Sequence, residues 1–360
     1  MKSVGIITNA SIGSGVGSRA YEIAKRMQAQ DEFAVSLTNL AELPVRKLPG
    51  FLGSKSVAWI RVARSIPKSD IYDLSNQTLS FIAKHRHPSI VTVHDLIELT
   101  NPQDIRASLV NRYLLSGITH ANRIVTVSEY TKRSVSEHYG ISPSRIAVIP
   151  NGVSASYMPI ENFTETIAYK QLVQDYAIHS RTPLIMHVGS EHPRKNLKTV
   201  LNTIAILKKQ YPDVLLLKIG EPGLRSGRAN TLHLIDQLNL RNNVKFLGSI
   251  PLDRINELYT IADALLFPSK LEGFGLPPLE AMAAGCPVVC SNATALPEVV
   301  GDGGLMHDAD NAEAFAASIR HILTNTEFRN NLIERGKKRS TLFSWDIAAR
   351  DMVKIYRELL

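Results

Sequence analysis

The chain has 360 residues, of which 44% are hydrophobic and 21% are charged, and a chain of this length usually folds into two domains. It contains no run of about 18 apolar residues, so no membrane-spanning helix is expected. Its two cysteines, Cys286 and Cys290, are too few for a disulfide framework or a zinc site, and we expect both to be buried in a core.

The formal net charge of +8 is concentrated in residues 1–150, which hold 18 Lys and Arg against 11 Asp and Glu. A basic half indicates an anionic partner, namely a phosphorylated acceptor, an acidic membrane surface or nucleic acid; a solvated surface is the alternative. No zinc-finger, RNA-binding or basic-heptad pattern is present, so nucleic acid is not expected. The N-terminus lacks the apolar core of a signal peptide, and we therefore expect a cytoplasmic protein with peripheral contact to the inner membrane face.

The chain opens with a strand, a glycine-rich loop and a helix, the order that begins a doubly wound α/β domain. The strand is expected at residues 4–9, and the loop after it contains Gly13, Gly15 and Gly17. The loop is not a Walker A sequence, and Ser18 stands where a dinucleotide-binding fingerprint has its third glycine. It either lets a ligand approach the backbone closely or forms a tight turn without a ligand.

Apolar runs predict the remaining strands of the first half. Strands are expected at 33–37, 71–74, 90–94, 123–128 and 146–150, with helices at 105–120 and 129–139. One of these strands ends on His94. Because open α/β sheets bind ligands at the carboxyl ends of their strands, His94 is a candidate site residue, with a purely structural histidine as the alternative.

A second alternating series begins with a strand at residues 183–189. Arg194 and Lys195 follow it, just before a helix, in a position suited to holding phosphate; a solvated basic pair is the alternative. Further strands are expected at 214–220, 244–248, 264–268 and 287–291, and helices at 229–238, 251–262, 312–325, 327–341 and 344–360.

Within this second series, Glu272 and Glu280 bracket a glycine-containing loop and a helix start that carries two prolines. Proline is tolerated in the first helical turn, where backbone N–H groups have no partner within the helix. We expect the N–H groups of Phe274, Gly275 and Leu276 to face a ligand, since a helix N-terminus favours an anion.

These motifs, taken in order, resemble the retaining GT-B glycosyltransferases of family 4, the glycogen-synthase-like glycosyl transferases group 1. The most specific motifs are Pro193-Arg194-Lys195-Asn196-Leu197 and the Glu272-x7-Glu280 pair, and shorter matches are Val93-His94-Asp95-Leu96, Val127-Ser128-Glu129-Tyr130-Thr131, Ile146 to Val153 and Leu296-Pro297-Glu298-Val299. One departure concerns Gly189-Ser190, where many relatives have Gly-Arg, so Arg194 is expected to supply that cation.

The resemblance implies two Rossmann-like doubly wound domains that face a central cleft. Residues 1–165 would form the acceptor-side domain, joined by the C-terminal helix at 344–360, and residues 166–343 the nucleotide-sugar domain. Such enzymes move a hexose from a UDP- or GDP-linked donor, a co-substrate, to a hydroxyl of a glycan or lipid-linked glycan. The resemblance implies no metal and no other cofactor.

The resemblance also implies a role for each candidate residue. Arg194 and Lys195, with the N–H groups of residues 274–276, would hold the donor diphosphate, and Glu280 would bind the ribose. Glu272 and His94 would contact the donor sugar as catalytic residues. The loop with Gly13, Gly15 and Gly17 would approach the phosphates or the acceptor. Retention by a covalent intermediate and by attack on the face that the nucleotide leaves both stay open.

Two other functions fit the same pattern. A sugar-nucleotide 2-epimerase shares the two-domain architecture but needs no separate acceptor. A non-catalytic protein that only binds a nucleotide sugar is the second alternative. The donor base, the sugar and the acceptor are not readable from the residues, although the basic first half favours an anionic, lipid-linked acceptor.

Overall fold

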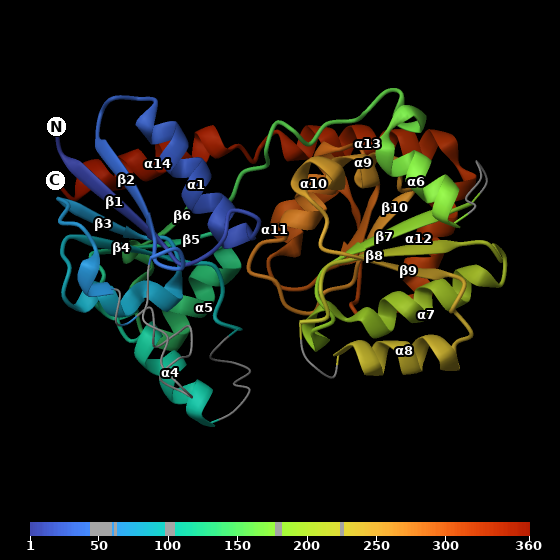
Figure 1. Ribbon diagram of the computed structural model, residues 1–360, viewed down its shortest axis with the longest axis horizontal. Coiled ribbons are helices and arrows are strands. Elements are labelled where there is room, and N and C mark those ends of the chain that lie inside the picture. Colours follow the sequence, from blue (N-terminus) through green and yellow to red (C-terminus); the bar gives the residue numbers. More distant parts are fainter. Residues whose placement is uncertain (44–59, 61–62, 98–104, 177–181, 224–226) are drawn as a thin grey trace. The chain divides into compact units, whose positions relative to one another are not determined.

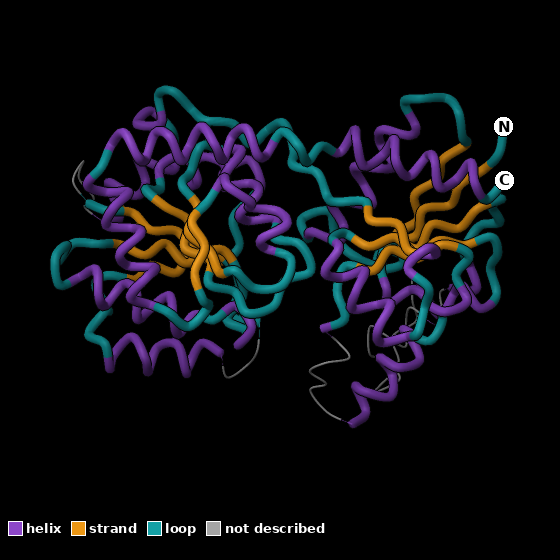
Figure 2. The backbone as a smooth tube through the Cα atoms, turned by 180° about the vertical axis from the view of Figure 1, so that it is seen from behind, coloured by secondary structure: helices purple, strands orange, loops and turns teal. Residues whose placement is uncertain are grey.

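The computed structural model describes residues 1–43, 60, 63–97, 105–176, 182–223 and 227–360. These residues form two compact units, one made of Met1–Gly152 and Phe343–Leu360 and the other of Val153–Leu342 (Figure 1). Each unit contains a parallel sheet of six strands, and Figure 2 shows helices on both faces of each sheet. None of the helices in the described ranges combines the length and the apolar character that crossing a membrane requires. The two parallel sheets with helices on both faces confirm the predicted α/β, doubly wound fold.

The sheet of the first unit has the strand order β2-β1-β3-β4-β5-β6. Its strands are continuous apolar runs because both faces are covered, and every residue of β3 and β4 is buried. The strands are β1 (Ser3–Thr8), β2 (Ala34–Asn39), β3 (Ile71–Leu74), β4 (Ser89–Val93), β5 (Arg123–Thr126) and β6 (Ile146–Val148), and the helices are α1 (Gly15–Gln28), α4 (Ile105–Leu115), α5 (Glu129–Tyr139) and α14 (Trp345–Glu358).

The C-terminal helix α14 belongs to this first unit. It starts at an N-cap, Ser344, whose side chain accepts a hydrogen bond from the N–H of Asp346. Its apolar face packs against α1 through Met352 and Tyr356, both buried. The Tyr356 hydroxyl donates a hydrogen bond to Asp73 on β3, which ties the end of the chain to the centre of the sheet.

One predicted helix of this unit is shorter than expected. The sequence predicts a helix at 105–120, but α4 ends at Leu115 and a separate 3₁₀ turn follows at Ile118–His120. A Cβ on Gly117 would lie 1.7 Å from the carbonyl oxygen of Ser80, so the chain passes close to another backbone at this point. This tertiary contact, which the local sequence does not reveal, explains the break.

The sheet of the second unit has the order β12-β11-β10-β7-β8-β9, so the chain reverses direction across the sheet between β7 and β10. The strands are β7 (Leu184–Val188), β8 (Leu215–Ile219), β9 (Val244–Gly248), β10 (Ala264–Phe267), β11 (Val288–Ser291) and β12 (Leu305–His307). The helices are α6 (Ile167–Tyr176), α7 (Leu197–Lys208), α8 (Gly227–Gln237), α9 (Leu252–Ile261), α10 (Leu276–Ala283), α11 (Leu296–Val300), α12 (Ala312–Thr324) and α13 (Thr326–Ser340).

Two features of the second unit differ from the expectation. The short edge strand β12 has no counterpart among the predicted strands, because three half-buried residues give too little pattern. The first unit ends at Gly152, whereas the sequence assigned residues 1–165 to it. The segment after Gly152 is held in the second unit by Asn256 of α9, which exchanges hydrogen bonds of 3.2 and 3.0 Å with the backbone of Met158. Cys286 and Cys290 are buried, as expected.

Candidate functional site

The candidate donor site lies where two neighbouring strands of the second unit end. Arg194 and Lys195 follow β7 in a 3₁₀ turn, and Glu272 follows β10. β7 and β10 pair in parallel, so their carboxyl ends lie side by side at the point where the strand order reverses. Open α/β sheets bind ligands at this topological switch point.

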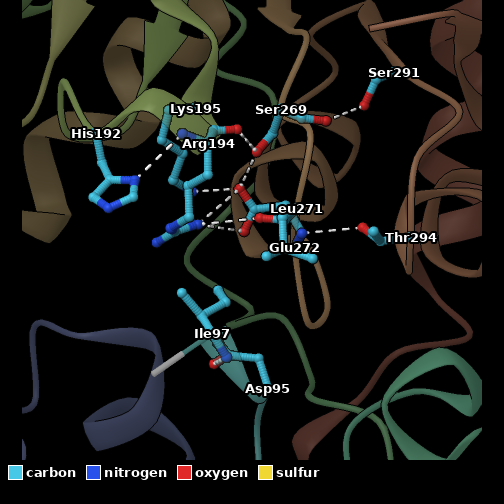
Figure 3. Close-up of polar contacts among 10 residues, drawn as sticks. All are labelled: Asp95, Ile97, His192, Arg194, Lys195, Ser269, Leu271, Glu272, Ser291 and Thr294. Atoms are coloured by element: carbon cyan, nitrogen blue, oxygen red, sulfur yellow. Dashed lines mark hydrogen bonds and ion pairs between the residues drawn. The ribbon is translucent and has the colours of Figure 1, made fainter. Parts of the chain in front are cut away.

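Arg194, Lys195 and Glu272 form one ion cluster (Figure 3). The Nζ atom of Lys195 lies 2.5 Å from Glu272 Oε1, and Nη1 of Arg194 lies 3.4 Å from each carboxylate oxygen. The Ser269 hydroxyl donates to the same Oε1 at 2.6 Å. The side chains of Lys195 and Glu272 are only 10% and 11% exposed. Two cations thus share one anion, which leaves the cluster with a surplus of positive charge.

Backbone contacts fix the loops that carry this cluster. The Arg194 carbonyl accepts a hydrogen bond from the Lys270 N–H at 2.8 Å, and it lies 3.0 Å from the Ser269 hydroxyl, whose one proton it shares with Glu272 Oε1; these contacts join the turn after β7 to the loop after β10. The N–H of Glu272 donates to the Thr294 hydroxyl at 3.0 Å. Sequence reasoning missed Ser269 and Thr294, because a serine or threonine near a strand end carries no distinctive pattern.

The cluster keeps Glu272 ionised. Burial by itself would raise the pKa of this carboxyl, but the charges of Lys195 and Arg194, with hydrogen bonds from Lys195 and Ser269, hold the pKa below its ordinary value. At neutral pH Glu272 is therefore an acceptor of hydrogen bonds and not a proton donor. Burial and the two neighbouring cations also lower the pKa of His192, whose Nδ1 accepts from the Arg194 N–H at 3.3 Å.

Helix α10 begins at Leu276, four residues after Glu272, and has few N–H donors at its N-terminus. Prolines at positions 277 and 278 have no N–H, so Gly275 and Leu276 supply the donors that the first turn leaves without an intrahelical partner. Gly275 has a φ of 117°, and a Cβ there would lie 2.7 Å from Leu296 Cδ2, so only glycine fits. Phe274 is buried.

Glu280 lies one helical turn after Leu276 on the same side of α10. The hydroxyl of Tyr259, on α9, donates to Glu280 Oε2 at 3.0 Å, and the hydroxyl of Tyr157 donates to the same carboxyl group. Burial raises the pKa of Glu280 to about 7, against the opposing effect of the two tyrosines. Neither tyrosine is predicted from the sequence, because they are far from Glu280 along the chain and belong to no motif.

In the first unit, His94 directly follows β4 and is buried. Its Nε2 lies 3.0 Å from the carbonyl oxygen of Ser75. A carbonyl only accepts, so Nε2 carries the proton, and the unprotonated Nδ1 is left as an acceptor. Burial, with the charge of Arg19, lowers the pKa of His94 to about 4, so the ring is neutral at physiological pH.

The glycine loop follows β1 at the same carboxyl edge of that sheet. Ser14 caps α1 by accepting from the Gly17 N–H at 3.0 Å. A Cβ on Gly17 would lie 1.8 Å from the Ser11 carbonyl oxygen, so local packing alone requires this glycine. A Cβ on Gly13 would meet nothing within 4 Å, and Gly15 is the exposed first residue of α1.

The structure thus brings Arg194, Lys195 and Glu272 into contact, and places Gly275, Leu276 and Glu280 along one helix. His94 and the glycine loop lie at the carboxyl edge of the other sheet. Within the described ranges, no group of three or more His, Cys, Asp and Glu side chains is arranged to hold a metal ion.

Two family models match the chain. Residues 13–157 match the model described as Glycosyltransferase Family 4, and residues 169–339 match Glycosyl transferases group 1. The chain is 30% identical to O-antigen chain mannosyltransferase B of Escherichia coli over 78% of its own length and 73% of that protein. It is 28% identical to the serotype-specific mannosyltransferase WbdA of Escherichia coli over 76% of its own length, and spans only about a third of that longer protein (34%).

Solved structures of similar fold cover nearly the whole chain. The crystal structure of Anabaena Alr3699/HepE in complex with UDP-glucose superposes with a TM-score of 0.78 at 20% identity, covering 99% of this chain and 100% of that one. The glycosyltransferase WaaG, involved in lipopolysaccharide biosynthesis, superposes with a TM-score of 0.73 at 18% identity, covering 98% and 99%.

Proposed function

The chain belongs to glycosyltransferase family 4 and is a nucleotide-sugar glycosyltransferase of the GT-B fold, and from this premise we propose that it is a retaining hexosyltransferase. Its donor site is the cluster of Arg194, Lys195 and Glu272 together with the N-terminus of α10. The observation that carries the proposal is the surplus positive charge of this cluster at the switch point of the sheet.

The chemistry of these groups suits a nucleoside diphosphate as leaving group. Negative charge grows on the diphosphate as the glycosidic bond breaks, and fixed cations with oriented N–H groups stabilise that charge. Arg194, Lys195 and the N–H groups of Gly275 and Leu276 supply these elements, so the transfer needs no metal. Phe274 contributes its backbone to the same loop.

The two acidic residues have different tasks in this proposal. Glu272, kept ionised by its cations, accepts hydrogen bonds from hydroxyls of the donor sugar and lies near the developing positive charge. Glu280 accepts from the ribose. His94 acts from the first unit as a neutral acceptor through Nδ1, since its Nε2 proton is committed to Ser75. The Gly13–Gly17 loop approaches the phosphates or the acceptor.

For the donor, we propose a hexose, with mannose as the first sugar to test. O-antigen chain mannosyltransferase B, the relative that is 30% identical, transfers mannose according to its name, and the similar fold of HepE holds UDP-glucose. UDP and GDP are the first two nucleotides to compare, and ADP is the third.

For the acceptor, we propose a glycan linked to an anionic lipid at a membrane surface. A cavity of about 330 Å3 in the first unit is lined by the buried apolar side chains of Phe81 and Ile82 and by the cationic side chains of Arg64 and Arg86. The segments 74–94 and 105–128 beside it contain no Asp or Glu. Tyr113, which also lines the cavity, is 44% exposed. A cavity lined by both cationic and apolar side chains suits a lipid phosphate.

The donor site is tested by calorimetric binding of UDP, GDP and ADP, followed by a panel of donor sugars. Arg194→Ala is expected to weaken nucleotide binding by about tenfold or more, as removal of a charge-assisted contact does. Lys209→Ala removes an exposed charge just beyond the C-terminal end of α7 and is the matched control. If no nucleotide binds, the proposal fails.

Product analysis separates the proposal from its alternatives. With acceptor and donor together, a product with the anomeric configuration of the donor is expected, read by nuclear magnetic resonance. Donor converted to its 2-epimer in the absence of acceptor would instead identify an epimerase. Donor binding without turnover in the presence of any of the glycan or lipid-linked acceptors tested would favour a nucleotide-sugar-binding protein.

The acceptor surface is tested by sedimentation with lipid vesicles. Vesicles that contain phosphatidylglycerol are expected to carry the protein down, and pure phosphatidylcholine vesicles are not. Arg64→Ala combined with Arg86→Ala should release it, whereas Arg320→Ala, on α12 of the second unit, should not. Equal sedimentation with both vesicle types would argue against this acceptor surface.

A further inference from the structure

Two tyrosine hydroxyls converge on the carboxyl group of Glu280. Tyr259 is fully buried on α9, and its hydroxyl donates to Oε2 at 3.0 Å. Tyr157, in the segment that enters the second unit, provides the other hydroxyl. The two rings meet edge to face, with centroids 6.1 Å apart and an interplanar angle of 64°.

Helix α9 also holds Tyr157 in place. Asn256, one helical turn before Tyr259, donates to the Met158 carbonyl at 3.0 Å and accepts from its N–H at 3.2 Å. This bidentate contact fixes the backbone next to Tyr157. One face of α9 therefore orients both tyrosines, and through them the carboxyl group of Glu280 on α10.

Both tyrosines can act only as donors to this group. Burial, with the charge of Glu280, raises their pKa values above the ordinary value, so the hydroxyls stay protonated. An ionised carboxylate offers about four acceptor positions, and the tyrosines take two of them. About two positions are left, and Glu280 itself is partly accessible to solvent. Two adjacent acceptor positions match the two vicinal hydroxyls of a ribose.

We propose that Tyr157 and Tyr259 are positioning residues that make the donor site selective for ribonucleotides, by turning the two remaining acceptor positions of Glu280 toward the 2′- and 3′-hydroxyls. The inference rests on the proposed role of Glu280 and extends it. A carboxylate that two fixed donors already hold loses little rotational entropy when the ribose binds. A nucleotide without these hydroxyls covers the two remaining acceptor positions of Glu280 and leaves them unpaired.

The test compares a ribonucleoside diphosphate with its 2′,3′-dideoxy analogue by isothermal titration calorimetry, using uridine or guanosine diphosphate, whichever binds. The wild type is expected to prefer the ribonucleotide by about tenfold to a hundredfold, the range for hydrogen bonds to a charged group. Tyr259→Phe and Tyr157→Phe are each expected to reduce this ratio by about fivefold or more, with little change in affinity for the dideoxy analogue.

Tyr211→Phe is the matched control. Tyr211 lies in the same unit but just before β8, at the amino edge of the sheet, so its hydroxyl is remote from Glu280. Tyr157 is only partly buried, so its variant tests the proposal even if Tyr259→Phe fails to fold. In steady-state assays, both variants should raise KM for the donor and leave kcat nearly unchanged.

The outcomes separate this inference from the proposed function. If the tyrosine variants keep the wild-type ratio, or lose affinity for both nucleotides equally, the tyrosines are structural and the inference is wrong. If Glu280→Gln also keeps the wild-type ratio, Glu280 does not bind the ribose, and the proposed site fails with it. If Glu280→Gln abolishes the preference while the tyrosine variants retain it, only the inference falls.

Discussion

Glu280 is expected to make donor binding depend on pH near neutrality, and Glu280→Gln is expected to remove that dependence. In the free protein the pKa of Glu280 is about 7, so at pH 7 half of the molecules carry it protonated. Ribose hydroxyls donate to the ionised form and lower its pKa on binding. Affinity should therefore rise with pH through the free-state pKa and level off above it. For a pKa near 7, affinity at pH 6 is about tenfold weaker than at pH 8.

The assay is calorimetric titration of a nucleotide sugar at pH 6, 7 and 8 in buffers of different ionisation enthalpy. A nucleotide sugar is used because its diphosphate is esterified at both ends and does not titrate in this range. At pH 7 the wild type should release about half a proton per molecule bound. Glu280→Gln should bind more weakly and release none.

The Glu280→Gln variant separates the titration of Glu280 from that of the other ionisable groups of the site. Glu272 is ionised across the range, and the pKa of His94 is about 4. Burial also lowers the pKa of His192. Wild-type affinity that is the same at pH 6 and pH 8, or a proton release that persists in Glu280→Gln, would refute the reasoning.

Three further substitutions test the packing around the site. Lys195→Met should destabilise the protein by about 3 kcal/mol at pH 8, since the ionised Glu272 stays buried beside weaker partners. In this variant burial raises the pKa of Glu272, so the loss of stability relative to the wild type should shrink by pH 5. An equal loss of stability in thermal unfolding at pH 8 and pH 5 would contradict this. Gly275→Ala should lower the thermal midpoint and weaken nucleotide binding together, because the φ of 117° strains any residue with a Cβ and the Leu296 side chain, 2.7 Å from that Cβ, would have to shift. An unchanged midpoint would count against that geometry. Tyr356→Phe leaves a buried carboxyl group on β3 without its donor and should cost about 1–3 kcal/mol in denaturant unfolding, with α14 the first element to exchange amide hydrogens; uniform exchange would speak against a local anchor.

Much of the fold and part of the site follow from local sequence. Buried parallel strands are continuous apolar runs, and the residues just after them lie at the ligand-binding edge of a sheet wherever the strands pair. Arg194, Lys195 and Glu272 could be identified in this way, because each follows such a run within a few residues. Their direct contact could not, since it depends on β7 and β10 being neighbours despite the strands β8 and β9 between them in the chain.

The sequence by itself determined the alternation of strands and helices, the family motifs and the position of His94 at a strand end. Tertiary structure decided which nitrogen of His94 is engaged, because Ser75 directly follows the neighbouring strand β3, and it brought Tyr157 and Tyr259 to Glu280. Periodicity and spacing describe only the immediate chain neighbourhood of a residue. The charge state and orientation of a buried side chain depend instead on partners from distant segments, whose approach is fixed by packing.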